Sequence, residues 1–227
     1  MSAARTKTVF VIHTSFALVD VLNPLFRQEL PNVRIVNIVD DSLLADVRAV
    51  GRVPPSVVRR MVGYAVLAQS SGAHAIFNVC SSVGEVADIM RQAVDIPVVK
   101  IDDAMTTEAV TRGKEIAVVA TLPTTLGPTA RLVERKAVEA KKVVNIHRHL
   151  AEGAFDVLVG GDPQKHDEMV AEEIIRAAQK SEVVALAQAS MARLVPQLAG
   201  KVTVPILSSP LSGVKELRRI VEQLQVA

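Results

Sequence analysis

The chain has 227 residues, of which 49% are apolar and 22% charged, which is enough apolar material for one large globular domain or two small ones. The formal net charge is only +2, and the basic residues form no long run, so the sequence lacks the clustered basic residues that are typical of a nucleic-acid-binding protein. No apolar run reaches the roughly 18 residues of a membrane span, the N-terminal segment is too short for a signal peptide, and a single cysteine fits a reducing compartment, so we expect a cytoplasmic protein without a membrane partner.

Eight short β-branched runs predict strands, and the stretches between them have helical spacing. In chain order the predicted strands are 9–14, 33–39, 74–79, 96–101, 117–122, 142–147, 183–188 and 204–209. Strands that alternate with helices predict βαβ units and a parallel sheet, and an aliphatic chain with 3% aromatic residues suits strands buried on both faces. We also predict a long loop over 40–55, as a lid or an oligomer contact, and a C-terminal helix over 211–224 that packs on the first half.

The two halves of the sequence superpose at one constant shift of 108 positions, with no gap. The matches are Val11 on Val119, Val36-Asn37-Ile38 on Val144-Asn145-Ile146, Met61 on Met169, Ser82 on Ser190 and Pro97 on Pro205. Self-similarity at a domain-sized period indicates duplicated units. We therefore predict an α/β fold of two pseudo-twofold-related Rossmann-like lobes, each with a mainly parallel four-stranded sheet, and an active site in the interlobe cleft. The predicted lobes are 1–103 with 210–227, and 104–209.

Parallel sheets bind ligands at the carboxyl ends of their strands, and Cys80 follows the third predicted strand. An S-x-x-E pattern from Ser82 to Glu85 predicts a capping box, which would place Cys80 two residues before a helix start. The positive end of a helix favours a thiolate, and a thiolate is suited to moving a proton at carbon. The alternative for a lone cysteine is a small buried apolar residue.

Other candidates lie in the loops after predicted strands. Their small hydroxyl groups can hold a carboxylate, or they can serve as helix caps: Thr14, Ser15, Ser81, Ser82, Thr121, Thr125 and Ser190. His13 ends the first strand and is either an acid–base group or a hydrogen bonder at the strand end. Asp102-Asp103 follow the fourth strand, where they contact a substrate amine or cap a helix, and Asp162 indicates another helix start.

The sequence predicts neither a metal nor a nucleotide cofactor. His147 and His149 share one face of a predicted strand, but no third ligand lies at a useful spacing. No glycine-rich phosphate-binding motif follows a strand.

Three segments together resemble the aspartate/glutamate racemase superfamily, which includes hydantoin racemases, maleate isomerases and arylmalonate decarboxylases. They are the Cys-Ser-Ser loop from Cys80, the VVATLPTT segment that opens the second half, and LAQASM from residue 186. The resemblance covers nearly the whole chain. It implies proton transfer without a cofactor, at a carbon next to a carboxylate or carbonyl, by two cysteines acting from opposite faces. By position Cys80 matches the first cysteine, whereas the second position reads Gln188, or Ala189 if the loop slips by one, and neither exchanges a proton.

We therefore expect a racemase or isomerase that acts on a small carboxylate, namely an amino acid, a hydantoin or a dicarboxylate, through Cys80. The alternatives are a decarboxylase with a single cysteine and a catalytically inactive ligand-binding relative. The expected substrate contacts are the small hydroxyl residues named above together with Ala189, and we expect a homo-oligomer.

Overall fold

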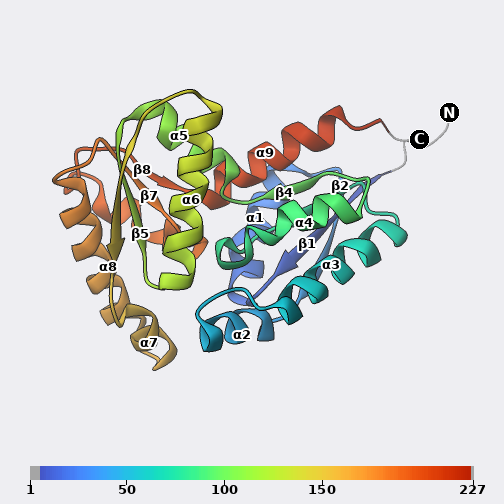
Figure 1. Ribbon diagram of the computed structural model, residues 1–227, viewed down its shortest axis with the longest axis horizontal. Coiled ribbons are helices and arrows are strands. Elements are labelled where there is room, and N and C mark those ends of the chain that lie inside the picture. The colour runs from blue at the N-terminus through green and yellow to red at the C-terminus, as the bar shows by residue number, and fades with distance from the viewer. Residues whose placement is uncertain (1–5, 226–227) are drawn as a thin grey trace. The chain divides into compact units, whose positions relative to one another are not determined.

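The computed structural model describes residues 6–225, which form two compact units with the same sheet topology. Unit 1 comprises residues 6–101 with 210–225, and unit 2 comprises residues 102–209. Each unit holds one four-stranded sheet whose neighbouring strands are all parallel, with helices packed around it (Figure 1). The predicted α/β class is therefore confirmed. Within residues 6–225, no helix combines the length and apolar character that crossing a membrane requires.

The sheet of unit 1 has the strand order β2-β1-β3-β4. Its strands are β1 (Lys7–His13), β2 (Val33–Val39), β3 (Ala75–Asn78) and β4 (Val98–Lys100). Its helices are α1 (Ala17–Glu29), α2 (Ser42–Val50), α3 (Pro55–Ser70), α4 (Val86–Ala93) and α9 (Ser209–Gln223), and a 3₁₀ turn, η1 (Ser81–Val83), follows β3. Ile12 packs with Met61 of α3 and Met90 of α4, whereas Phe77 meets Phe26 of α1 edge to face at 6.2 Å between ring centroids. Apolar side chains therefore cover both faces of this sheet.

The sheet of unit 2 has the equivalent order β6-β5-β7-β8. Its strands are β5 (Glu115–Ala120), β6 (Asn145–Leu150), β7 (Val183–Leu186) and β8 (Ile206–Ser208). Its helices are α5 (Asp103–Arg112), α6 (Pro123–Glu139), α7 (Ala154–Val159) and α8 (Pro163–Ala178), with 3₁₀ segments η2 (Ala189–Leu194) and η3 (Pro196–Leu198). Val118 packs with Val133 of α6, and its neighbour Val119 packs with Ile174 of α8, so adjacent residues of β5 face opposite layers.

The gap-free repeat is wrong in one region. The shift of 108 holds between α3 and α8 and between β3 and β7. However, Lys7 pairs with Val33, whereas its repeat mate Glu115 pairs with Asn145, a shift of 112 for the second strand. Helix α6 has 17 residues and α1 has 13, so one extra turn moves β6 along the chain, and the predicted match of 36–38 with 144–146 was a chance identity. The strand predicted at 142–147 begins at residue 145 instead.

The long loop predicted over 40–55 is also wrong, because this segment contains helix α2. Leu43 and Val47 lie four residues apart and are both buried, which is the spacing of one helix face. Asp41 is the residue before the helix, and Asp40 forms the turn that leads into it, since its Oδ1 accepts hydrogen bonds from the Ser42 backbone N–H at 3.1 Å and from Ser42 Oγ at 2.5 Å. The aspartates that suggested a loop are therefore helix-start residues.

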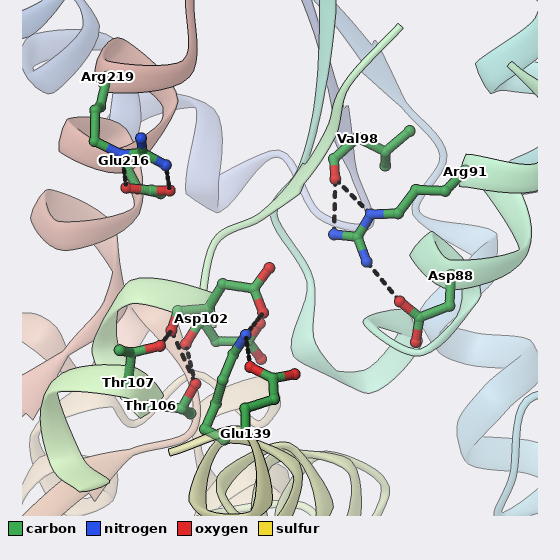
Figure 2. Close-up of polar contacts among 11 residues, drawn as sticks. Asp88, Arg91, Val98, Asp102, Thr106, Thr107, Glu139, Glu216 and Arg219 are labelled. Atoms are coloured by element: carbon green, nitrogen blue, oxygen red, sulfur yellow. Dashed lines mark hydrogen bonds and ion pairs between the residues drawn. The ribbon is translucent and has the colours of Figure 1, made fainter. Parts of the chain in front are cut away.

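The two units exchange the helix that follows their fourth strand. The chain leaves β4 and enters α5, which belongs to unit 2, and it leaves β8 and enters α9, which belongs to unit 1. In the first turn of α5, Thr106 Oγ1 donates to the Asp102 carbonyl at 2.8 Å (Figure 2). In unit 1, Arg91 of α4 donates to the Val98 carbonyl through Nε at 2.9 Å, and to Asp88 through another nitrogen, so α4 is tied to β4 (Figure 2).

Three contacts hold α9 in unit 1. Arg218 lies 3.1 Å from the carboxylate of the buried Glu29 in α1, and Lys7 Nζ donates to the Val221 carbonyl at 2.7 Å. The third contact is a close backbone approach, because a Cβ atom on Gly213 would lie 2.5 Å from the Ile101 carbonyl oxygen. Only glycine fits at this point of the helix.

Candidate active site

The predicted site residues lie at the carboxyl ends of the two central strands of each sheet. In unit 1, His13 ends β1 and is followed by Thr14 and Ser15, while Cys80, Ser81 and Ser82 follow β3. In unit 2 the corresponding residues are Thr121 and Thr125 after β5, and Gln188, Ala189 and Ser190 after β7. Because neighbouring parallel strands end at one edge, each unit gathers its own candidates at a single edge of its sheet.

Cys80 is partly exposed and packs against the apolar cluster that contains Ile12. The predicted capping box after it is wrong, because the 3₁₀ turn Ser81–Val83 starts directly after Cys80 and α4 starts only at Val86. The Val83 N–H donates to the Cys80 carbonyl at 3.3 Å, which closes this turn and leaves Ser82 inside it rather than at an N-cap. Cys80 therefore precedes a short 3₁₀ turn and not an α-helix.

Asn78, at the end of β3, is a residue of this edge that the sequence analysis missed. It is 1% exposed, its Oδ1 accepts the Cys80 backbone N–H at 3.3 Å, and its Nδ2 donates to the Val83 carbonyl at 3.4 Å. A buried amide that uses both ends within one loop restrains that loop. The available signal was an asparagine inside the otherwise apolar strand around residues 74–79.

His13 is completely buried, and its Nε2 lies 2.9 Å from Asn37 Oδ1 on β2. Burial lowers the pKa of His13 below its usual value although the hydrogen bond to Asn37 opposes this, so the imidazole is neutral at physiological pH. Its Nδ1 is buried and has no hydrogen-bond partner. Strand alternation places His13 on the face of Val11, whereas Cys80 packs with Ile12 on the other face. An acid–base role for His13 stays a prediction.

The small hydroxyl residues of unit 1 are mainly shielded from solvent. Thr14, Ser81 and Ser82 are buried, and Ser15 Oγ accepts the Ala17 N–H at 3.3 Å, which is turn chemistry at the start of α1. In unit 2, Thr121 and Thr125 are also buried, Ala189 is 7% exposed, and the Ser190 carbonyl accepts a hydrogen bond from Arg193 at 2.7 Å. Their contact with a substrate stays a prediction.

Gln188 occupies the place in unit 2 that Cys80 occupies in unit 1. Its Oε1 accepts the Thr121 backbone N–H at 2.6 Å, and its Nε2 donates to Thr121 Oγ1 at 2.8 Å. The side-chain amide thus joins the ends of the two central strands. No group with an exchangeable acidic proton stands at this position, since an amide does not titrate in the physiological range.

The two histidines of β6 are paired with carboxylates. His147 Nε2 lies 2.6 Å from Glu115 Oε2, and His149 Nδ1 lies 2.7 Å from Glu173 Oε1. Among residues 6–225 no group of three or more His, Cys, Asp or Glu side chains is placed to hold a metal ion.

Comparisons with solved structures show the same fold at low sequence identity. A glutamate racemase from Bacillus anthracis superposes with a TM-score of 0.72 and 18% identity, covering 96% of this chain and 83% of that one. An allantoin racemase from Klebsiella pneumoniae superposes with a TM-score of 0.70 and 19% identity, covering 95% of this chain and 88% of that one. An unliganded arylmalonate decarboxylase superposes with a TM-score of 0.58 and 14% identity, covering 97% of this chain and 95% of that one. A comparison with curated protein sequences finds no match.

A family model described as Asp/Glu/Hydantoin racemase matches residues 9–217, which span both units and every candidate loop. The predicted resemblance is confirmed at the level of the family, while the replacement of a second cysteine is not tested by this match. The chain belongs to the Asp/Glu/hydantoin racemase family.

Proposed function

We propose that this protein is a cofactor-independent racemase or isomerase that moves a proton at a carbon next to the carboxylate of a small substrate, with Cys80 as the proton-transferring group. The observation that carries this proposal is the position of Cys80. It is the sole cysteine, it is partly exposed, and it lies two residues after a central strand, at the carboxyl edge of a sheet. Membership of a racemase family supports the same reaction class.

In the proposed step, the Cys80 thiolate takes the proton from the substrate carbon, and the electron pair of the C–H bond moves onto the adjacent carboxylate as an enediolate. Return of the proton from Cys80 regenerates the substrate, whereas a proton from solvent water on the opposite face of the planar enediolate gives the other enantiomer; the thiolate is restored when the Cys80 thiol gives its proton back to water. Buried hydroxyl and backbone N–H groups of the same edge, such as Thr14 and Ser82, would hold the enediolate oxygens. Groups that bind the enediolate more tightly than the substrate supply the rate enhancement.

The substrate class is proposed from the names of the structural neighbours. These include a glutamate racemase and an allantoin racemase, so amino acids, hydantoin-like ureides and small dicarboxylates are the compounds to test first.

A second candidate is a decarboxylase in which one thiol protonates the carbanion left by departing carbon dioxide. Gln188 favours it, because the position equivalent to Cys80 carries an amide already bonded to Thr121 and offers no second proton. The likeness to an arylmalonate decarboxylase is consistent with this alternative. A third candidate is a ligand-binding relative without catalysis.

The deciding experiment incubates the protein in deuterated water with aspartate, glutamate, a 5-substituted hydantoin and an α-substituted malonate. Proton NMR then follows deuterium uptake at the reacting carbon, and optical rotation follows the configuration. We expect uptake with at least one compound, complete loss in Cys80→Ala, and a strong reduction in Cys80→Ser, whose hydroxyl is a much weaker acid. Undiminished uptake in Cys80→Ala would exclude the thiol from the reaction.

The outcomes separate the candidates. Release of carbon dioxide with formation of one enantiomer identifies the decarboxylase, and Gln188→Cys should then add slow racemisation of the product. No turnover of any compound, together with a Cys80 that alkylates no faster than a free thiol, identifies the ligand-binding relative.

A further inference from the structure

We propose that Asn78 is a positioning residue for Cys80, because it fixes the main chain that carries the thiol. This inference rests on the proposed function for its catalytic consequence, whereas its structural part concerns the loop alone.

Asn78 acts as a clamp on the loop from Cys80 to Val83, in the sense that one side chain hydrogen-bonds two points of that loop. Asn78 is the last residue of β3 and is 1% exposed, so its amide has no access to bulk water. Its Oδ1 receives the Cys80 N–H at 3.3 Å, and its Nδ2 reaches the Val83 carbonyl at 3.4 Å. One side chain therefore binds the loop at both ends, at the backbone N–H of Cys80 and at the carbonyl of Val83, the last residue of the 3₁₀ turn. Burying a polar group is unfavourable unless it is hydrogen-bonded, so both contacts stabilise one loop conformation.

Unit 2 shows that an asparagine is not required to build such an edge. The residue equivalent to Asn78 is Leu186, which is fully buried in the apolar core of that unit. There Gln188, two residues after β7, is held through its own side chain, by Thr121. In unit 1 a restraint acts on the backbone N–H of Cys80, and Asn78 supplies it.

The consequence falls on the chemical step more than on substrate binding. A displaced nucleophile or base lowers the rate steeply, because proton transfer depends on reacting atoms being held close to their reactive arrangement. Of the groups that would hold the substrate oxygens, Thr14 lies outside this loop, and Ser82 within it would act on the enediolate, which forms only in the chemical step. Loss of the clamp should therefore lower kcat and leave KM nearly unchanged.

The test compares two clamp variants with a control from the same strand. Asn78→Leu introduces the residue that unit 2 uses at this position. Asn78→Val has a β-branched side chain suited to a strand and no hydrogen-bonding group, so it serves if the leucine variant does not fold. The control is Ile76→Val, which removes one methylene from a buried residue two positions earlier on the same face of β3 and touches neither hydrogen bond.

Two readouts are measured, and the first needs no substrate. Hydrogen exchange of the Cys80 backbone amide, followed by NMR, should become about tenfold faster in the clamp variants because the amide loses its acceptor. With the substrate found above, kcat should fall about 10- to 100-fold with KM within about twofold. Ile76→Val should change neither quantity.

The proposal is overturned if the Cys80 amide exchanges at the wild-type rate in both clamp variants, if kcat stays within twofold of wild type, or if Ile76→Val matches their loss. Failure of the proposed function looks different. In that case Cys80→Ala retains full activity, and the exchange measurement still reports on the Asn78 clamp.

Discussion

Cys80 and Gln188 share one backbone conformation at equivalent points of the two sheets. Cys80 has φ −129° and ψ 115°, and Gln188 has φ −120° and ψ 129°. Each follows a central strand by two residues and precedes a 3₁₀ segment. The two units thus share the main-chain conformation at this point and differ in the side chain, which is a thiol in unit 1 and an amide in unit 2.

The first prediction concerns the Gln188–Thr121 pair. Gln188→Ala removes the acceptor from the buried Thr121 N–H, so the free energy of unfolding should fall by about 1–3 kcal/mol. Urea denaturation measures the change. Gln188→Glu keeps an oxygen in the same place and should lower the free energy of unfolding by a smaller amount. A Gln188→Ala variant as stable as the wild type would show that water replaces the amide.

The second prediction is a pH dependence that originates at His13. Burial lowers the pKa of His13 in the folded state, so the unfolded state takes up the proton first as the pH falls. The free energy of unfolding should therefore decline as the pH drops below about 6.5, with a slope of at most about 1.4 kcal/mol per pH unit from this one proton. Denaturation curves between pH 5 and 8 should show a shallower decline for His13→Gln.

A neighbouring substitution checks the assignment. Asn37→Asp places a carboxylate beside His13 Nε2, which raises the pKa of the imidazole and should also flatten the profile. Identical slopes in wild type, His13→Gln and Asn37→Asp would assign the pH dependence to other groups.

The third prediction concerns Asp40 and the stability of the folded protein at low pH. Burial raises the pKa of Asp40, but hydrogen bonds from Ser42 and Tyr64 and the charge of Arg60 outweigh it, so the pKa lies below its usual value. Tyr64 Oη donates to Asp40 at 2.7 Å, and Tyr64→Phe should therefore cost about 1.5–3 kcal/mol at pH 7.

The sign of the pH effect follows from the lowered pKa of Asp40. Its stabilisation is complete above the unfolded-state pKa of about 3.9 and is lost as the pH falls through the lower folded-state value. The difference in unfolding free energy between wild type and Tyr64→Phe should shrink over that range. A constant difference down to pH 2 would contradict the role of the carboxylate.

The fourth prediction tests how α9 is attached. Arg218→Leu leaves the buried Glu29 carboxylate with Gln28 as its remaining hydrogen-bond donor, and because an incompletely satisfied buried acceptor is unfavourable, the midpoint of thermal unfolding should fall. The matched control is Arg219→Leu on the same helix, which breaks only its pair with Glu216 (Figure 2). This change should lower the midpoint of thermal unfolding by less than Arg218→Leu does. Glu29→Gln added to Arg218→Leu should recover part of the loss, as thermal unfolding can measure.

The fifth prediction contrasts two helical glycines. Gly213→Ala forces a methyl group against the Ile101 carbonyl and should destabilise by about 1–3 kcal/mol. Gly63→Ala, in α3, meets no atom within 4 Å and should stabilise by about 0.5–1 kcal/mol because alanine favours helix. Equal effects of the two changes in thermal unfolding would refute the close approach of α9.

The sequence was informative where one residue type determines the local structure. β-branched runs predicted the strands, and Met, Ser and Pro in one register predicted the duplication, because both signals reside in short segments. The repeat failed between β5 and β6, where one added helical turn changes the register without a local mark. The helix over 42–50 was missed because two apolar residues four apart are a weak signal beside flanking aspartates and prolines.

The site was predicted as a set of loops but not as a set of contacts. Cys80 is marked by its chemistry, and the capping pattern after it suggested a helix that the 3₁₀ turn replaces. The partners of His13 and Gln188 lie 24 and 67 residues away in the chain, so only the folded structure brings Asn37 and Thr121 to them. Sequence spacing carries no record of such pairs.

The exchange of α5 and α9 has a consequence for synthesis on the ribosome. Unit 2 is one uninterrupted stretch, whereas unit 1 is completed by α9, which is synthesised after all of unit 2. Domains fold as units once their chain is available, so unit 2 can complete its folding before unit 1 does. Until α9 has emerged, the nascent unit 1 leaves uncovered the backbone at Ile101 that Gly213 will approach.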